Sequence, residues 1–343
     1  MRLVDLCPYG VFPPRSGGHR LVHHTSFCLG LRHEVWVFAM GLRRSDGLRL
    51  RSFVQRPGGR YVEYRHVTPL TLLSYLRRRR TGLPPLRASS VLRWTAPDVL
   101  KHRLAAADVV QVETPWQFAF ARATASCPIV LVEQNAEAQL LAARSVSRRL
   151  VALATRLERA ALLEADAVIF LSPEDRTAVT DAYGLVRRDL YTCGVGVDTE
   201  TFQPALDAER AAAKAALGVV GPVALFAGSW HLPNRSALAA VRVIAARTPG
   251  WTFLVVGSVG RPAESAGRVR VTGPVDDVLP FFRAADARRR GVPGAGLGLA
   301  IVAHCAAALG LSLSAFPREN GGTVFRVANR RGDEATVSPQ ERT

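Results

Sequence analysis

The chain has 343 residues, of which 48% are hydrophobic and 21% are charged. This length is typical of two domains rather than one, and the composition excludes a largely disordered protein. The formal net charge is +17, but only Lys101 and Lys214 are lysines, and the arginines are scattered along the chain. That scatter agrees with the codon bias of a GC-rich genome at least as well as with a basic binding face. No nucleic-acid partner is therefore expected.

Cysteine usage and hydropathy indicate where the protein works. The five cysteines, Cys7, Cys28, Cys127, Cys193 and Cys305, are far apart, and they form neither a metal-binding spacing nor a disulfide framework. We therefore expect no metal site and a reducing cytoplasm. The N-terminus lacks a basic flank followed by a long apolar run, so no signal peptide is predicted. No uncharged apolar stretch approaches the ~20 residues of a membrane helix, so any membrane contact would be peripheral, at the inner face.

Short apolar runs predict the strands of an N-terminal parallel sheet. In chain order they are residues 2–7, 34–39, 108–113, 128–133 and 167–172. Helical patterns separate several of them, which favours a doubly wound α/β domain.

The loop after the first strand carries a glycine pair. Gly17 and Gly18 precede a predicted helix over residues 21–29. Glycines here let backbone N–H groups approach a phosphate, and the helix N-terminus adds positive potential. A plain tight turn explains the same two residues equally well.

The densest basic segment is the arginine run, Arg77, Arg78, Arg79 and Arg80, which follows the apolar sequence LLSYL. A solvated helix end is the simplest interpretation. Contact with an anionic membrane face and recognition of a phosphorylated substrate are the alternatives.

The helix after the strand at 167–172 has clear end signals. Ser172 is a suitable N-cap, Pro173 suits the first helical position, and Gly184 closes the helix. Glu174 and Asp175 complement the positive end of the helix dipole.

A second α/β unit follows a polar, alanine-rich connector near residues 203–221. Its predicted elements are a strand at 223–228, a helix at 236–247, strands at 251–257 and 269–273, and a helix at 276–286. Two Rossmann-like units joined by a connector predict ligand binding at the carboxyl ends of the strands.

Six passages taken together resemble a known family. They are PYGVFPPRSGG (8–18), GLRHEVWVFA (30–39), VLVEQNAEAQLL (130–141), the segment 158–184, VGVDTETFQP (195–204) and ALFAGSWHLPNRSAL (224–238). Their order and separation are similar to those of the family 4 glycosyltransferases, retaining enzymes of the GT-B architecture.

The resemblance implies transfer of a sugar from a nucleotide-sugar donor to a glycan or lipid-linked acceptor, with no cofactor. It places the donor phosphates near Gly17 and Gly18, Gly228 facing the donor, and the acceptor near Asn135 and Glu137. It assigns no catalytic residue to this chain.

Two departures from the family pattern stand out. Many relatives have His where this chain has Gln134, and glutamine does not titrate near neutral pH. Beyond Asp286 the chain lacks the family's glycine-rich strand end, its basic residue for the diphosphate and its pair of glutamates, one of which holds the donor ribose. We therefore expect weakened activity.

Residues 288–328 resemble instead the C-terminal end of a sensor histidine kinase ATPase domain. Gly294, Gly296 and Gly298 would form its phosphate-binding lid, followed by a helix and by two strands that flank Gly321 and Gly322. Under that alternative the ligand is Mg-ATP, but the chain shows neither of the upstream ATPase motifs.

The sequence thus predicts four segments: an acceptor-side domain (1–200), a partial donor-binding domain (201–287), the kinase-like fragment (288–328) and a disordered tail (329–343). Three functions compete: a glycosyltransferase, a histidine-kinase-type ATP-binding protein, and a glycan-binding remnant without activity.

Overall fold

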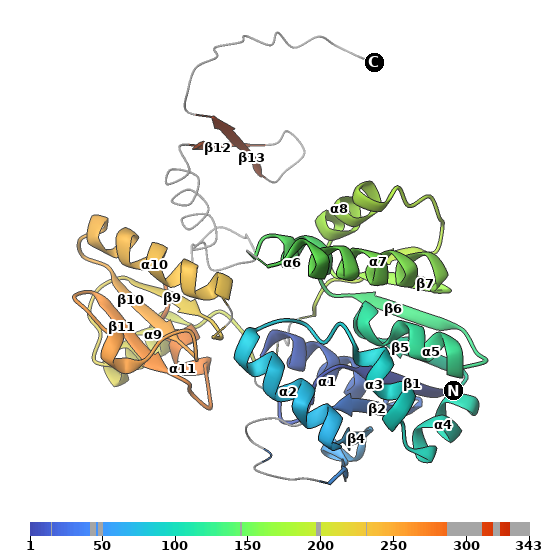
Figure 1. The fold of residues 1–343 in the computed structure, drawn as a ribbon. Helices are drawn as coiled ribbons and strands as arrows, with labels where there is room; N and C mark the ends of the chain where they lie inside the picture. The colour runs from blue at the N-terminus through green and yellow to red at the C-terminus, as the bar shows by residue number, and fades with distance from the viewer. Residues whose placement is uncertain are drawn as a thin grey trace. The chain divides into compact units, whose positions relative to one another are not determined.

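The computed structural model describes residues 1–14, 16–41, 46, 51–144, 146–196, 200–230, 232–286, 311–317 and 323–329. The chain divides into two compact units, Met1–Gly196 and Val197–Thr343, drawn in blue to green and in yellow to red in Figure 1.

The first unit is built on an eight-stranded sheet with the order β3-β4-β2-β1-β5-β6-β7-β8. The strands are β1 (Arg2–Cys7), β2 (Glu34–Met40), β3 (Phe53–Gln55), β4 (Val62–His66), β5 (Val109–Val112), β6 (Ile129–Glu133), β7 (Ala167–Phe170) and β8 (Leu190–Thr192). Only the β3–β4 pair is antiparallel. The direction of winding reverses between β1 and β5, which is where open α/β sheets bind their ligands.

Helices cover both faces of this sheet. They are α1 (Gly17–Leu29), α2 (Pro69–Thr81), α3 (Ala88–Thr95), α4 (Asp98–Ala105), α5 (Phe118–Thr124), α6 (Glu137–Ala142), α7 (Arg148–Glu164) and α8 (Pro173–Tyr183). Alternation along β1 explains the two cores: Leu3 and Cys7 pack with α1, whereas Val4 and Leu6 join the larger core on the opposite face.

The predicted caps of α8 are confirmed. The Ser172 hydroxyl accepts a hydrogen bond from the Asp175 amide, Pro173 begins the helix, and Gly184 ends it in the left-handed conformation. The five predicted strands correspond to β1, β2, β5, β6 and β7.

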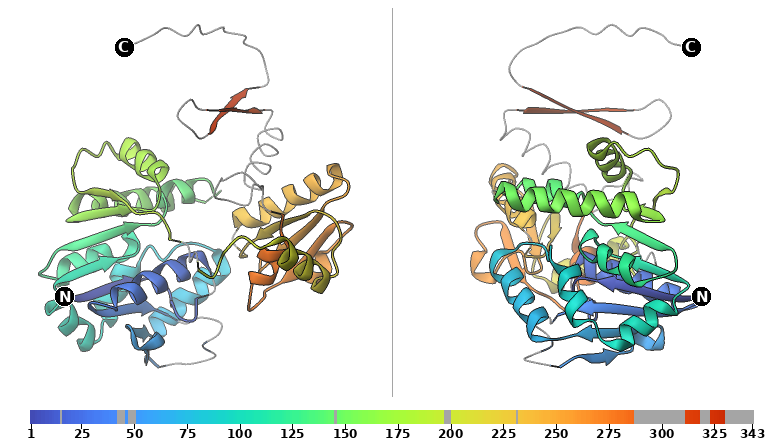
Figure 2. Two further views of the ribbon diagram at one scale, coloured as in Figure 1. Left: turned by 180° about the vertical axis from the view of Figure 1, so that it is seen from behind. Right: turned by 45° about the vertical axis from the view of Figure 1, so that its right-hand side comes forward.

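The second unit contains a three-stranded parallel sheet, β11-β10-β9. Its elements are β9 (Val223–Ala227), α10 (Leu232–Arg247), β10 (Thr252–Val256), β11 (Val269–Gly273), α11 (Leu279–Ala284) and α9 (Asp207–Ala216). Leu238, Val241 and Ala245 of α10 pack on one face of the sheet, and residues from α11 and the end of α9 cover the other. Figure 2 shows these helices on the two faces of the small sheet. The two parallel sheets confirm the predicted α/β fold class, with a truncated second domain.

One prediction in this region was wrong. The segment 203–221 is not a simple connector, because it contains α9. Its run of alanines favours helix, Asp207 and Glu209 lie in the first turn, and Lys214 lies in the last.

The C-terminal part of the chain is described only at two strands. β12 (Leu311–Pro317) pairs antiparallel with β13 (Thr323–Asn329), so the two strands expected around Gly321 and Gly322 are present. Gly294, Gly296 and Gly298 lie outside the described residues. The predicted tail (329–343) does too, except for Asn329, which is the last residue of β13.

Candidate functional site

The glycine turn after β1 is shaped by its cap and by one aromatic neighbour. Ser16 caps α1 by accepting a hydrogen bond from the His19 amide, so the helix begins at Gly17 rather than at residue 21. A β-carbon on Gly18 would lie 2.9 Å from the Tyr9 hydroxyl oxygen, whereas one on Gly17 would meet nothing within 4 Å. A side chain at Gly18 would therefore displace the Tyr9 hydroxyl, whereas Gly17 borders open space.

A chain of hydrogen bonds joins this turn to the carboxyl ends of β5 and β6. The Tyr9 hydroxyl donates to Oε1 of Gln134 (3.1 Å), and Nε2 of Gln134 donates to Oε2 of Glu113 (2.5 Å). The other Glu113 oxygen accepts from Nε2 of Gln111 (2.6 Å). The ends of three adjacent strands, β1, β5 and β6, therefore share one hydrogen-bonded group beneath Gly18, called the polar floor below: Tyr9, Gln111, Glu113 and Gln134.

Glu113 lies beside a second buried carboxyl, Asp5. Burial, and then the charge of Glu113, raise the pKa of Asp5 well above its ordinary value. Burial also raises the pKa of Glu113, but the hydrogen bonds from Gln111 and Gln134 lower it. Asp5 is therefore the protonated member of the pair, and Glu113 carries the charge.

One member of the arginine run faces this floor. The guanidinium of Arg78 lies over the ring of Tyr9, 5.5 Å from its centroid. Its charge is also among the influences that lower the pKa of Glu137. Arg77 and Arg80, on the same helix, are exposed. The interpretation of the run as a solvated helix end is therefore wrong for Arg78, because its stacking on Tyr9 draws it toward the site.

Asn135 and Glu137 lie together just beyond β6. Nδ2 of Asn135 donates to Oε1 of Glu137 (3.2 Å), and Asn135 is exposed. Burial raises the pKa of Glu137, while this hydrogen bond lowers it. Gln134 directly precedes Asn135, so the hydrogen-bonded group under Gly18 and the Asn135–Glu137 turn are neighbours in the chain at the end of β6.

A buried acidic pair fixes the backbone of that turn. Glu158 of α7 accepts hydrogen bonds from the amides of Glu137 (2.6 Å) and Ala138 (3.1 Å) and from the Tyr183 hydroxyl. Burial and then the charge of Glu158 raise the pKa of the neighbouring Glu133 well above its ordinary value. Burial raises the pKa of Glu158 as well, but its hydrogen bonds with Tyr183, Ala138 and Glu137 lower it, so Glu158 is the ionised partner and Glu133 stays protonated.

This arrangement predicts a pH dependence. A carboxyl with a raised pKa in the folded state binds its proton more tightly there than in the unfolded chain, so stability falls as pH rises from about 4.3 toward the folded pKa. In Glu133→Gln the side-chain amide can still donate a hydrogen bond toward Glu158, but the group at position 133 no longer titrates. We expect the unfolding free energy of the wild type to fall relative to this variant between pH 4 and 8, by at most about 1.4 kcal/mol per pH unit.

Urea unfolding at several pH values measures this difference. The control is Glu164→Gln, which replaces an exposed carboxylate on α7, the helix that carries Glu158. We expect its unfolding free energy to depend on pH as that of the wild type does. Parallel curves for the wild type and Glu133→Gln would show that Glu133 is ionised in the folded protein.

In the second unit, glycines join the carboxyl ends of the three strands. The Gly228 amide donates to the Val256 carbonyl (2.9 Å), and the Gly257 amide donates to the Gly273 carbonyl (2.9 Å). The Gly228 carbonyl accepts from the Val259 amide (3.1 Å). The position predicted to face the donor, Gly228, therefore belongs to a close-packed backbone layer at the end of the sheet.

Two absences apply to the part of the chain that the structure describes. No group of three or more His, Cys, Asp or Glu side chains there is arranged to hold a metal ion. Among the same residues, no helix has the length and apolar character needed to cross a membrane.

Sequence similarity places this site in a known family. The model of Glycosyltransferase Family 4 matches residues 15–201, more than half of the chain. This chain belongs to glycosyltransferase family 4. The match covers the glycine turn, Gln134, and the Asn135–Glu137 turn. Family 4 members are retaining enzymes that use nucleotide-sugar donors, which favours the glycosyltransferase hypothesis over the histidine-kinase hypothesis.

Solved structures show the same fold for this family 4 chain. Sucrose-phosphate synthase from Thermosynechococcus elongatus has a TM-score of 0.62 at 16% identity, over 89% of this chain and 79% of that one. The catalytic domain of starch synthase IV from Arabidopsis thaliana, bound to ADP and acarbose, has a TM-score of 0.57 at 14% identity, over 84% of this chain and 77% of that one. Anabaena HepE, in complex with UDP and glucose, has a TM-score of 0.55 at 17% identity, over 89% of this chain and 79% of that one.

No curated protein sequence gives a significant match. The family match and these structures also give no support to a histidine-kinase relationship for residues 288–328.

Several site residues escape prediction from the sequence. Tyr9 and Glu158 lie in passages that resemble family 4 and Arg78 lies in the arginine run, but the sequence did not single out these three, or Glu113, as site residues. The sheet brings them together from segments that lie far apart in the chain. Glu113 could have been found from the sequence, because it directly follows the buried strand β5, and open α/β sheets bind their ligands at the carboxyl ends of the strands.

Proposed function

We propose that this protein transfers a sugar from a nucleotide-sugar donor to a glycan or lipid-linked acceptor with retention of anomeric configuration. The observation that carries the proposal is the placement of Gly18, Tyr9 and Gln134, with the Asn135–Glu137 turn that follows directly in the chain, at the carboxyl ends of β1 and β6. The family match supports it, because the matched residues include the glycine turn, Gln134 and the Asn135–Glu137 turn.

The donor phosphates bind at Gly17 and Gly18 in the first unit, and Gly228 faces the donor in the second. Open space beside Gly17 lets a phosphate approach the backbone amides. Two structural relatives hold UDP and ADP. A nucleoside diphosphate sugar is thus the donor class to test.

The acceptor binds against Asn135 and Glu137. Their carboxamide and carboxyl groups suit the hydroxyls of a sugar. The guanidinium of Arg78, stacked on Tyr9, adds a positive charge beside these groups. Phosphate oxygens on either substrate suit this charge.

Activity is weak in this proposal. The residues past Asp286 do not contain the family's motif of a basic residue and paired glutamates, so fewer groups hold the leaving diphosphate.

Calorimetry with a panel of UDP- and ADP-sugars, and separately with Mg-ATP, tests the proposal. We expect saturable binding of at least one nucleotide sugar, followed by transfer to an acceptor. Saturable ATP binding without nucleotide-sugar binding would favour the kinase-type alternative. Acceptor binding without any donor binding would leave a glycan-binding remnant.

The exposed part of α2 is a candidate membrane contact at the inner membrane face. Leu70, Leu73 and Leu76 are 47%, 63% and 49% exposed, and Arg77 and Arg80 follow them on the same helix. Apolar side chains next to arginines favour an anionic lipid surface. Arg77→Ser with Arg80→Ser is expected to weaken binding to vesicles rich in phosphatidylglycerol, by about fivefold per arginine.

Sedimentation with anionic and with neutral vesicles measures this binding. The exposed Arg188→Ser on the same unit serves as the charge control. If the wild type binds neither vesicle, or if the double variant binds like the control, α2 does not contact the membrane.

A further inference from the structure

The loop between β1 and α1 is held from beneath by a buried ion cluster on another strand. Glu63 and Arg65 alternate along β4, so both side chains lie on the face that carries α1. Both are fully buried, at 0% exposed, and Nε of Arg65 lies 3.0 Å from Oε1 of Glu63. In the sheet, β2 separates β4 from β1, so the loop extends across one strand to reach this pair.

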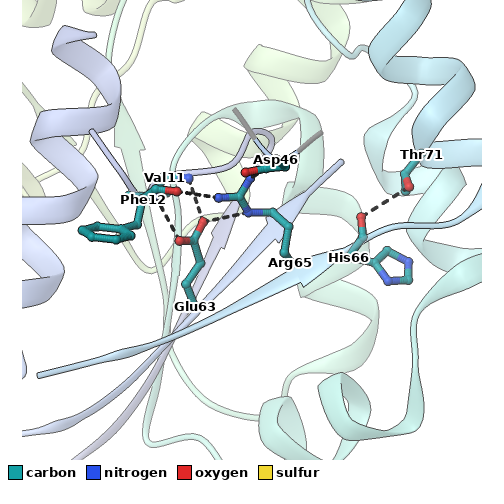
Figure 3. A network of polar contacts seen from close by, with 7 residues as sticks. All are labelled: Val11, Phe12, Asp46, Glu63, Arg65, His66 and Thr71. Carbon is teal, nitrogen blue, oxygen red and sulfur yellow. Dashed lines mark hydrogen bonds and ion pairs between the residues drawn. The ribbon is translucent and has the colours of Figure 1, made fainter. Parts of the chain in front are cut away.

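The pair binds the loop backbone at three points, which Figure 3 shows. Oε1 of Glu63 accepts from the Val11 amide (2.7 Å), and Oε2 accepts from the Phe12 amide (3.0 Å). Nη2 of Arg65 donates to the Phe12 carbonyl (2.8 Å). The side chains of Glu63 and Arg65 therefore bind the amides of two consecutive loop residues and the carbonyl of one of them.

Charge balance ties the loop to the cluster. Nη1 of Arg65 also binds Oδ2 of Asp46 (2.6 Å), so two carboxylates share one guanidinium. The remaining negative charge in this buried place needs hydrogen-bond donors, and the Val11 and Phe12 amides supply them. Moving the loop away would leave the carboxylate of Glu63 without these donors.

Steric fit points the same way. A β-carbon on Gly10 would lie only 1.9 Å from Nη1 and 2.2 Å from Cζ of Arg65. The guanidinium therefore passes directly over the backbone of Gly10, and only glycine leaves room for it. The strand beneath is anchored too, because the carbonyl of His66 accepts from the Thr71 hydroxyl (3.3 Å) in the first turn of α2.

We infer that Glu63 and Arg65 are positioning residues that set the place of the glycine turn, and hence of the amides that meet the donor phosphates. This inference rests on the proposed function for its effect on the donor, and on the contacts above for its effect on the loop. Neither side chain touches substrate. A loop displaced by about 1 Å binds and orients a phosphate poorly, so substrate affinity and turnover depend on this pair.

The test compares Arg65→Lys and Glu63→Gln with Arg2→Ala. Lysine keeps the charge but loses the fork that reaches Glu63, Asp46 and the Phe12 carbonyl together. The control removes an exposed ion pair at the other end of β1, where Arg2 and Asp108 are 55% and 41% exposed. Hydrogen exchange at the Val11 and Phe12 amides and the Kd of UDP are measured for each variant.

We expect amide exchange in the loop to quicken by about tenfold or more and the Kd of UDP to rise by about tenfold in both variants, with the control unchanged. Unchanged exchange at Val11 and Phe12 would overturn the inference. Faster exchange with an unchanged Kd would overturn the link to the donor. If the wild type itself binds no nucleotide, the proposed function fails while the exchange result still decides whether the pair holds the loop.

A double-mutant cycle keeps the inference testable if a single variant folds poorly. Gly10→Ala is expected to quicken loop exchange in the wild type but to have little further effect in the Arg65→Ala background, because the guanidinium that it would strike is gone. Equal effects in both backgrounds would show that Arg65 does not hold the loop against Gly10. Arg65→Gln replaces Arg65→Ala if that background does not fold.

Discussion

Gly257→Ala is expected to destabilise the second unit strongly, although it adds only one methyl group. The Gly257 φ angle is +105°, and a β-carbon there would lie 2.3 Å from the Gly228 carbonyl oxygen. The variant therefore combines backbone strain of about 1–3 kcal/mol with displacement of the Gly228 turn, for a total loss above about 3 kcal/mol. Because Gly228 is the proposed donor-facing residue, nucleotide-sugar binding is lost as well.

The matched control for this variant is Gly250→Ala. The Gly250 φ angle is +91°, but a β-carbon there meets nothing within 4 Å, so only the backbone strain is added. Hydrogen exchange at the amides of β9 and β10 reports on this unit alone, without assuming that both units unfold together. Equal protection in the two variants would show that the close approach of Gly257 and Gly228 contributes little.

The glycine turn of the first unit provides the second large effect. In Gly17→Ala the new methyl enters open space, so the protein keeps its stability, but the methyl occupies the volume into which a donor phosphate would come. We expect the Kd for the nucleotide sugar to rise by about 10- to 100-fold while the melting temperature does not fall.

Gly18→Ala distinguishes packing from ligand contact at the same turn. Its methyl would lie 2.9 Å from the Tyr9 hydroxyl, so Tyr9 must move and its hydrogen bond to Gln134 is disturbed. A stability loss of about 1–3 kcal/mol is expected, measured by urea unfolding. Wild-type affinity in Gly17→Ala would show that donor phosphates do not approach this turn.

The sequence predicted the parallel strands well because buried parallel strands are continuous apolar runs, as in β1 and β10. It missed β4, which contains the fully buried charges Glu63 and Arg65. The sequence around β4 does not show what else compensates these charges, because the amide donors to Glu63 come from Val11 and Phe12, some fifty positions earlier.

The site was predictable in part for the same reason. A glycine turn can be located from one stretch of sequence, so Gly17 and Gly18 were identified as candidates, whereas Asn135 and Glu137 followed only from the resemblance to family 4. The position of Arg78 depends on how α2 lies against the loop that carries Tyr9, and no periodicity of the arginine run distinguishes it from its neighbours.

The place of Gln134 has a consequence for how the site responds to acidity. The side-chain amide of Gln134 accepts a hydrogen bond from Tyr9 through Oε1 and donates one to Glu113 through Nε2, and these two bonds fix the orientation of the amide. A neutral imidazole, as in many relatives, also offers one donor and one acceptor, but it gains a second proton within the physiological range and then can no longer accept. The glutamine keeps both directions of hydrogen bonding whatever the proton concentration. We therefore expect Gln134→His to add a pH dependence to ligand binding that the natural glutamine does not contribute.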